Sequence, residues 1–193
     1  MSLAERLRRA FDSEPAMGPL TGDGDIPAST GAIAAAVLIA VTERPQPGVI
    51  LTVRRDDMRT HAGQVAFPGG RIDPGEAAID AAVREAWEEI GLEREQVKTV
   101  GALDDYGTIT GYRVTPVVAV IPPDLALAPH EHEVADLFEA PLAFLLDPTK
   151  QRLESVLFEG KRRHYYQIDW NGRRIWGATA AMIVNLSRRL QWS

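Results

Sequence analysis

Residues 67–92 read FPGGRIDPGEAAIDAAVREAWEEIGL, and this stretch decides the fold. A Pro-Gly-Gly turn stops a short preceding strand, and residues 73–76, Asp-Pro-Gly-Glu, supply a turn with the negative charge that a helix N-terminus favours. Good helix formers then run from Ala77 to Ile90. Gly91 suits the left-handed conformation that ends many helices. The stretch therefore predicts a strand, a loop and one central helix, in that order.

The last two turns of the predicted helix carry a cluster of acidic residues. Glu85, Glu88 and Glu89 lie three or four positions apart or adjacent, so they share one face of the helix. Crowded carboxylates repel and raise one another's pKa, and a bound cation would relieve that repulsion. Magnesium accepts a few carboxylates and completes its coordination with water and phosphate oxygens. The alternative interpretation is a solvated acidic helix face that binds nothing.

From Gly70 to Leu92 the spacing is Gly-x5-Glu-x7-Arg-Glu-Ala-x-Glu-Glu-x-Gly-Leu. This pattern resembles the Nudix box, and only Ala86 is a small residue at an aliphatic position. The resemblance implies an α/β protein, the Nudix α/β/α sandwich with a mixed β-sheet and a loop–helix–loop catalytic motif. It also implies a metal-dependent pyrophosphohydrolase of nucleoside diphosphates linked to another group, with Mg²⁺ or Mn²⁺ as cofactor.

The resemblance assigns roles within the box. Glu85 and Glu89 are expected to be the main metal ligands, with Glu88 close to them, and Gly69 or Gly70 would let a backbone carbonyl approach the metal. Structural support of the site is expected from Gly69, Glu76, Arg84 and Gly91. For the pair Glu76 and Arg84, an ordinary surface ion pair is the alternative. Two further residues of the helix are expected in the core, Trp87 and Ile90.

The general base stays open at this point. A box glutamate is one candidate, Glu85 or Glu88, and Glu133 is the candidate outside the box because it lies just before a predicted strand. A charged loop without a catalytic role is the alternative for Glu133. His130 and His132 could bind metal beside it, and exposed bystander histidines are the alternative.

Residues 50–70 carry a second resemblance, to the coenzyme A pyrophosphatase branch of Nudix enzymes. The matching positions are Ile50-Leu-Thr-Val-Arg54, Arg59, Gly63 and Phe67-Pro-Gly-Gly70, and the spacing holds throughout. Arg55 departs from the small residue of that branch. Guanidinium groups bind phosphate in a bidentate manner, so Arg54, Arg55 and Arg59 are expected to bind the substrate. Solvated arginines that brace the fold are the alternative. The resemblance also implies that His61 and Gln64 flank the pyrophosphate, and turn residues without a binding role are the alternative for these two.

The resemblance implies cleavage of coenzyme A or an acyl derivative into 3′,5′-ADP and 4′-phosphopantetheine. Other Nudix substrates remain open at this stage, among them ADP-ribose, dinucleotides and nucleoside triphosphates. A Nudix module that senses a nucleotide without hydrolysing it is the alternative from a different class. The intact cluster at Glu85, Glu88 and Glu89 argues against a sensor, which has no need to activate water.

Composition narrows the partners. The chain has 193 residues, a formal charge of −6 and no cysteine, which disfavours nucleic acid as a partner and excludes thiolate metal sites and disulfides. The sequence shows neither a signal-peptide core nor an apolar run of membrane-spanning length. We therefore expect a cytoplasmic protein with a small nucleotide substrate and no membrane partner, and a homodimer is compatible with the sequence.

Apolar periodicity and turn residues predict the remaining elements. A helix is expected at residues 3–11, a loop at 15–31 and a last amphipathic helix at 178–190. Pro141 is expected to open a short helix. The expected division is an N-terminal helix and linker at residues 1–31, followed by one Nudix hydrolase domain at 32–193. The predicted strands lie at residues 32–41, 48–54, 64–67, 97–103, 112–121, 134–139, 153–158 and 165–169, with the last two as a hairpin.

Overall fold

The computed structural model describes residues 2–13, 17–23, 31–55, 63–158 and 160–191. Its helices are α1 (Leu3–Asp12), α2 (Ala78–Ile90), α3 (Leu142–Leu146) and α4 (Ala178–Arg189), with short 3-10 turns η1 (Arg94–Gln96) and η2 (Pro148–Lys150). Its strands are β1 (Ile33–Thr42), β2 (Gly48–Arg54), β3 (Val65–Ala66), β4 (Gly69–Arg71), β5 (Lys98–Ala102), β6 (Tyr106–Gly107), β7 (Tyr112–Ile121), β8 (Val134–Pro141), β9 (Arg152–Phe158), β10 (Lys161–Trp170) and β11 (Arg173–Trp176).

The central sheet is mixed. Its order is β3-β2-β1-β7-β5, with β4 added to β1, β6 to β7 and β8 to β2. β1 and β7 run parallel in one unbroken register from Ile33 opposite Tyr112 to Thr42 opposite Ile121, and the other pairings are antiparallel. A second, antiparallel sheet has the order β11-β10-β9. The predicted mixed sheet is confirmed.

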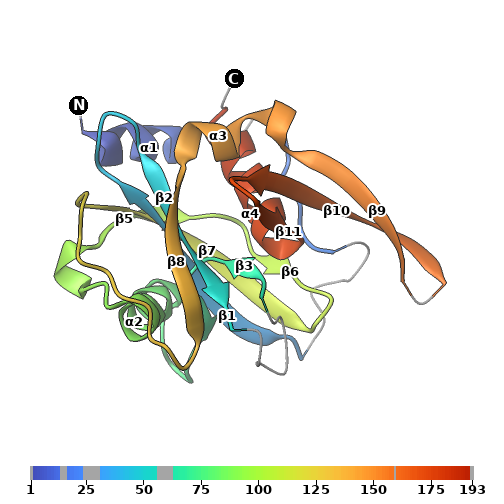
Figure 1. Ribbon diagram of the computed structural model, residues 1–193, viewed down its shortest axis with the longest axis horizontal. Helices are drawn as coiled ribbons and strands as arrows, with labels where there is room; N and C mark the ends of the chain where they lie inside the picture. The colour runs from blue at the N-terminus through green and yellow to red at the C-terminus, as the bar shows by residue number, and fades with distance from the viewer. Residues whose placement is uncertain (1, 14–16, 24–30, 56–62, 159, 192–193) are drawn as a thin grey trace.

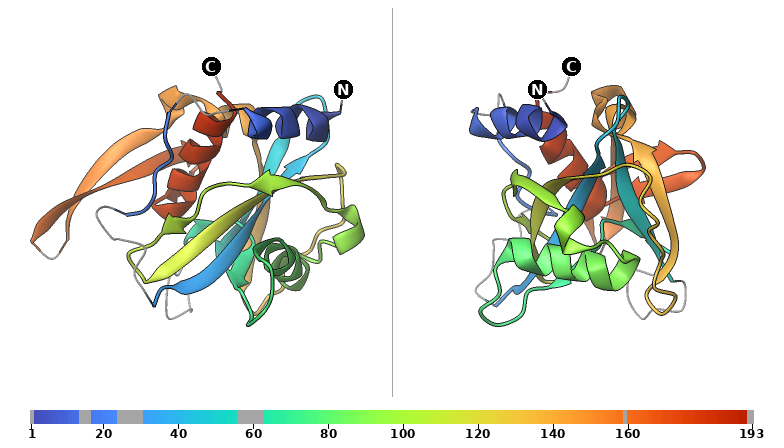
Figure 2. Two further views of the ribbon diagram at one scale, coloured as in Figure 1. Left: turned by 180° about the vertical axis from the view of Figure 1, so that it is seen from behind. Right: turned by 90° about the vertical axis from the view of Figure 1, so that its left-hand side faces the viewer.

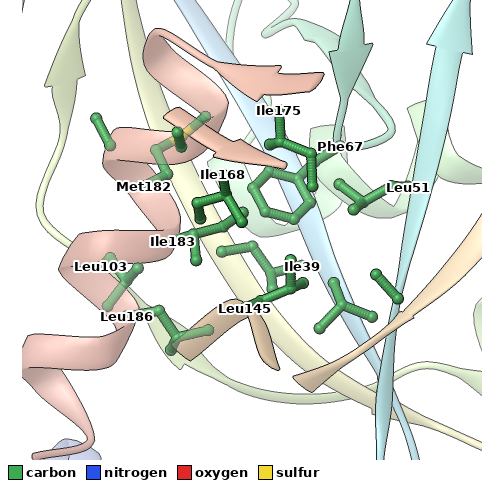
Figure 3. Close-up of a cluster of buried hydrophobic side chains, with 14 of the residues drawn as sticks. Ile39, Leu51, Phe67, Leu103, Leu145, Ile168, Ile175, Met182, Ile183 and Leu186 are labelled. Carbon is green, nitrogen blue, oxygen red and sulfur yellow. The ribbon is translucent and has the colours of Figure 1, made fainter. Parts of the chain in front are cut away.

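Side chains of β1 alternate between two apolar layers, as a strand buried on both faces requires. Ala36, Leu38 and Ala40 contribute to the cluster under α2. Ile39 and Val41 point to the opposite face, where α4 and the second sheet cover them (Figure 3). Figures 1 and 2 show α2 and α4 on opposite sides of the central sheet. This is the α/β/α sandwich that the sequence predicted.

The N-terminal helix is part of the same packing. Ser2 caps α1 and forms a reciprocal capping box with Glu5, which satisfies backbone donors at the first turn. Ala4 and Leu7 are buried against Val120 of β7. The amphipathic pattern of residues 3–11 therefore reflects contact with the central sheet. Within the described residues, no helix has the length and apolar character that a membrane crossing requires.

Most predicted elements are confirmed with ends shifted by a few residues, and the exceptions are short strands and helix details. The sequence interpretation missed β6 and β11, which are only a few residues long. Pro141 was expected to open α3, but it ends β8 and stands as the N-cap before the helix. The last helix was predicted to be amphipathic, whereas α4 is buried from Thr179 to Ser187 because α3, β10 and β11 also surround it.

The most consequential correction concerns the two glycines after Pro68. They were predicted to form a turn, and they form β4, antiparallel to β1. The ladder is extended on both sides, because Leu38 N donates to Pro68 O at 2.8 Å and Ile72 N donates to Ala34 O at 3.0 Å. Glycine is rare in strands unless a neighbouring group approaches closely, and here the neighbours are β1 and α2.

The two-layer packing of β1 gives a matched pair of substitutions. Ile39 is fully buried and Ile33, on the same strand, is 40% exposed. Ile39→Ala should lower the free energy of unfolding by about 2–5 kcal/mol, because it removes buried methyl groups and leaves a cavity. Ile33→Ala should lower the free energy of unfolding by well under half that amount. Chemical denaturation of both variants measures the difference, and equal losses would contradict the described core.

Candidate active site

The site begins where β4 inserts between β1 and α2. Gly69 lies opposite Val37 and Gly70 opposite Ala36. A Cβ atom on Gly69 would come within 2.6 Å of Val37 Cα, and one on Gly70 would come within 2.5 Å of the Glu85 carboxylate. Neither position has room for a side chain. The acidic face of α2 is therefore held directly against the backbone of β4.

Glu89 is the most deeply buried acid of the described residues, with 5% of its surface exposed. Gly69 N donates to its Oε2 at 3.2 Å. The pKa of Glu89 is raised to about 7. Burial is the largest cause and the charges of Glu85 and Glu133 add to it, against the lowering effects of the Gly69 hydrogen bond and of Arg54. Desolvation outweighs the neighbours that favour the charged form. The structure thus contains a carboxylate whose ionisation is not fully compensated by the protein groups around it.

Glu85 lies one helical turn before Glu89, on the same face. Burial is the main cause that raises its pKa, and the charges of Glu88 and Glu133 add to it. Arg84 counteracts these effects, because its Nη1 donates to Glu85 Oε1 at 2.8 Å. The helix therefore places two carboxyl groups in a partly desolvated position where negative charge is unfavourable without a cation.

Arg84 ties the loop of the box to the helix. Its Nε donates to Glu76 Oε1 at 2.9 Å and its Nη2 to Glu76 Oε2 at 3.0 Å, a bidentate pair. Nη2 also donates to Arg71 O at 3.0 Å. This pairing, with the backbone N–H of Asp73, lowers the pKa of Glu76 to about 2. Nη1 also lies within 3.5 Å of the Glu88 carboxylate, so one guanidinium group joins the loop, the strand and the acidic face.

The helix ends as the sequence indicated, but one side chain was misplaced. Gly91 has φ 68° and ψ 25°, the left-handed conformation, and its N–H donates to Trp87 O at 2.9 Å. Ile90 is fully buried as predicted. Trp87 was expected in the core and is 53% exposed. Helical spacing places it on the outer side of α2, whereas the core-facing positions of the last turns are taken by Ala86 and Ile90.

The loop that carries Glu133 is fixed by backbone hydrogen bonds. His130 N donates to Glu89 O at 2.8 Å, which attaches the loop between β7 and β8 to the end of α2. Arg55 Nη1 donates to Glu131 O at 2.5 Å, and Arg55 N donates to Glu133 O at 3.4 Å. The loop is thereby held between α2 and the end of β2. This position brings Glu133 to the cavity that also contains Glu89.

The two histidines of the same loop lie elsewhere. His130 and His132 are exposed, with ring centroids 5.3 Å apart. Neither lines the cavity that Glu133 enters. Their arrangement is that of the exposed bystanders that the sequence analysis left as the alternative.

A cavity of about 530 Å³ unites these groups. On its acidic side lie Glu85, Glu89 and Glu133, together with Gly69 and Gly70. Arg54 and Gln64 reach the same cavity from β2 and the segment before β3. Arg55 is not among its lining residues. Two other predicted substrate-binding residues, Arg59 and His61, lie outside the described residues.

The sequence analysis did not identify the residues that form the far wall of the cavity. It comes from the β6–β7 loop, from the start of α4 and from the N-terminal segment, through Asp23, Thr108, Ile109, Thr110, Tyr112, Trp176, Gly177, Ala178, Thr179 and Met182. Asp23 is held there by Tyr106 Oη, which donates to Oδ1 at 2.5 Å, and by Ile109 N, which donates to Oδ2 at 3.0 Å. Burial, with the nearby charge of Asp23, raises the pKa of Tyr106. The short strand β6 and the isolated Asp23 gave no periodic signal.

The chemistry of the acidic side fits a hard divalent cation. Its donors are carboxylate and backbone oxygens, and the chain contains no cysteine, which suits magnesium or manganese. The raised pKa values of Glu85 and Glu89 show carboxylates in need of positive charge. Among the residues described, no three acidic or histidine side chains already converge on one point. In their present rotamers Arg84 engages both Glu85 and Glu88.

Fold and site together define an α/β/α sandwich in which a loop–helix–loop holds carboxylates beside a cavity. The sequence model of the NUDIX domain matches residues 32–159. The chain belongs to the Nudix hydrolase family and is a pyrophosphate-cleaving enzyme of nucleoside diphosphate derivatives.

Individual relatives agree with this family. The chain is 43% identical over 157 residues to the uncharacterized Nudix hydrolase NudL of Escherichia coli K12, covering 81% of this chain and 82% of that protein. Identity to the NudL protein of Shigella boydii is 42% over the same length, with the same coverage. Among solved structures, the Nudix hydrolase RenU of M. smegmatis superposes with a TM-score of 0.51 at 28% identity, covering 59% of this chain and 73% of that one.

The buried Glu89 predicts an unusual pH dependence of stability without divalent cations. Its folded pKa of about 7 lies above the ordinary 4.5, so its stabilising contribution is fully present below pH 4.5 and is lost as the pH rises through 7. Between pH 5 and pH 8 the free energy of unfolding in chelator should fall by roughly 3 kcal/mol through this group. Glu89→Gln should remove that part of the slope.

Glu88→Gln is the matched control, because the Glu88 side chain is 47% exposed and should leave the slope nearly unchanged. Urea unfolding at several pH values measures both variants. An unaltered slope in Glu89→Gln would show that the carboxyl group is not desolvated.

Proposed function

We propose that this enzyme hydrolyses coenzyme A or an acyl-coenzyme A to 3′,5′-ADP and the corresponding 4′-phosphopantetheine. The observation that carries the proposal is the cavity that joins the acidic face of α2 to Arg54. Arg54 belongs to the segment, residues 50–70, that resembles the coenzyme A pyrophosphatase branch. A guanidinium group beside the carboxylates suits a substrate with more phosphate than the pyrophosphate alone.

The acidic residues divide into two roles in this proposal. Glu85 and Glu89 would hold the divalent cation, with Glu88 and the backbone of Gly70 next to them. When bound, the cation lowers the pKa of water and neutralises pyrophosphate oxygens. The reaction adds water to one phosphorus and breaks the phosphoric anhydride bond, so that each product carries a phosphate group. Arg84 and Glu76 would act only by fixing the loop and the helix.

Glu133 would accept the proton of the attacking water. It lines the cavity together with Glu85 and Glu89, on a loop held by Arg55 and by the end of α2. The competing assignment gives this role to Glu85 or Glu88, both of which would then leave the coordination of the cation incomplete.

Removing a proposed ligand tests the metal. Glu85→Gln or Glu89→Gln should lower kcat by about 100-fold or more, roughly 3 kcal/mol of barrier, because the attacking water loses its activating cation. Glu95→Gln, an exposed acid in η1, is the control and should keep full activity. Activity should vanish in EDTA and return with Mg²⁺ or Mn²⁺. Normal turnover by either α2 variant would overturn the assignment.

The proton acceptor has its own test. Glu133→Gln should lower kcat by about 100-fold and flatten the acidic limb of the pH–rate profile, while metal affinity changes little. Glu131→Gln is the matched control, since Glu131 is an exposed acid two positions away. Unchanged kinetics in Glu133→Gln would show that Glu133 is not the proton acceptor and would favour Glu85 or Glu88 of α2.

Coenzyme A and dephospho-coenzyme A differ only in the ribose 3′-phosphate, so their kcat/KM ratio measures recognition of that group. If Arg54 binds it, coenzyme A should be preferred by about 10- to 150-fold, the value of one charge-assisted hydrogen bond. Arg54→Ala should erase most of the preference, and Arg55→Ala, whose guanidinium group contacts Glu131 O, should retain it.

Equal losses on both substrates in Arg54→Ala would identify a structural arginine. Faster cleavage of ADP-ribose than of either coenzyme would overturn the proposed substrate and leave the family membership unaffected.

A further inference from the structure

The hairpin of β9 and β10 projects from the body of the molecule (Figures 1 and 2). Its base is anchored through β11 and α4, whereas its outer strand, β9, is the edge of the three-stranded sheet. Among the described residues, β9 pairs with β10 alone. An edge strand presents unpaired N–H and C=O groups that can pair with another strand.

The register of the hairpin assigns the side chains of β9 to two faces. Leu153 lies opposite Tyr166, and β10 turns its even-numbered residues, such as the buried Ile168, toward the core. Leu153 and Leu157 therefore share the face that continues from the core, and they are 59% and 74% exposed. Val156, on the other face, is 48% exposed. Natural edge strands are usually protected by charges, prolines or bulges. β9 carries Arg152 and Glu154 on one face but exposes two leucines on the other.

We propose that this edge binds a second copy of the chain, with the two β9 strands antiparallel about a two-fold axis at Ser155. The positions of the two exposed leucines, each two residues from Ser155, are the reason for choosing a second copy. In this register each residue opposes the one equally far from Ser155, so Leu153 of each copy faces Leu157 of the other. A two-fold interface uses the same surface patch on both subunits. The two three-stranded sheets become one continuous sheet, and both leucine pairs lie on one face of it.

Registers shifted by one residue oppose less favourable pairs of side chains. An axis at Glu154 would oppose the two Glu154 carboxylates and would place each Leu153 against a Ser155. An axis at Val156 would place each Leu157 against Ser155. Cross-strand apolar pairs stabilise a sheet and opposed like charges destabilise it. The Ser155 axis is the one of these three that pairs every exposed leucine with a leucine.

Charge on the strand does not oppose self-association. Arg152 Nε lies 3.5 Å from Glu154 Oε1, and Arg152 also pairs with Asp169 of β10. These charges belong to the face that carries Val156, whereas the leucines belong to the other. The network of Arg152, Glu154 and Asp169 is therefore satisfied within each hairpin. The leucine face also carries Arg162 of β10, which lies opposite Leu157 in the same hairpin and is exposed.

The absence of cysteine from the chain permits a direct test of the register. Ser155→Cys should form a disulfide-linked dimer rapidly under mild oxidation, because residues directly opposed in an antiparallel pair have Cα atoms about 4.5–5.5 Å apart, within disulfide range. Val156→Cys is the matched control on the same strand and should cross-link much more slowly, since the register opposes it to Glu154. Equal cross-linking by both variants would overturn the proposed axis.

The unmodified chain should sediment as a dimer at micromolar concentration. Leu157→Lys should raise the dimer dissociation constant at least about tenfold, whereas Met17→Lys, a change at a 59% exposed apolar residue outside the hairpin, should not. Leu157 lies outside the proposed catalytic groups, so an intact circular dichroism spectrum and melting temperature in Leu157→Lys establish that the variant is folded. A monomeric wild-type chain at about 100 µM, or a dimer unaffected by Leu157→Lys, would overturn the proposal.

Discussion

The close approach of β4 to both β1 and α2 is the constraint on which the rest of the site depends. Gly69 and Gly70 have no room for a Cβ atom, on one side because of Val37 and on the other because of Glu85. Their backbone groups thereby come close enough to join the sheet and to bind the acids, as Gly69 N does with Glu89. Side chains at these positions would move α2 outward, and with it the carboxylates.

This proximity has an electrostatic consequence. Glu89 is desolvated by the packing that also fixes its position. The ionised form of its carboxyl group is favoured by the hydrogen bond from Gly69 N and by the charge of Arg54. If α2 had only a structural role, an apolar residue at this position would stabilise the fold better than an acid, since burying charge without full compensation is unfavourable. The arginine nearest the cluster, Arg84, is oriented mainly toward Glu76. The unfavourable charge is therefore concentrated at the cavity, where a cation can offset it.

The sequence predicted those parts of the fold that depend on local sequence patterns. The helix from residue 77 to 90, its Gly91 cap and the long strands follow from period, propensity and turn chemistry, and all were found within a few residues. It did not predict β4, because glycine-rich strands form only when neighbouring elements approach, and that is a tertiary event. The prediction that Trp87 is buried was wrong for a related reason. Apolar character indicates burial, but the partner strand decides which side of a helix faces the sheet.

The cavity itself shows why substrate identity is harder to derive than reaction class. Most of its acidic side comes from one contiguous segment, so spacing alone could indicate Glu85 and Glu89, and Glu133 joins them from a distant loop. Its far wall combines Asp23, the Thr108–Thr110 loop and the start of α4, which are far apart in the sequence. Asp23 is held there by the buried hydroxyl of Tyr106, and Trp176 is held at the end of β11 through its pairing with β10. In the proposed reaction the bond that breaks would lie beside the acids, and the far wall would contact the group attached to the pyrophosphate. Selectivity among nucleoside diphosphate derivatives would then depend on residues whose positions depend on the whole fold.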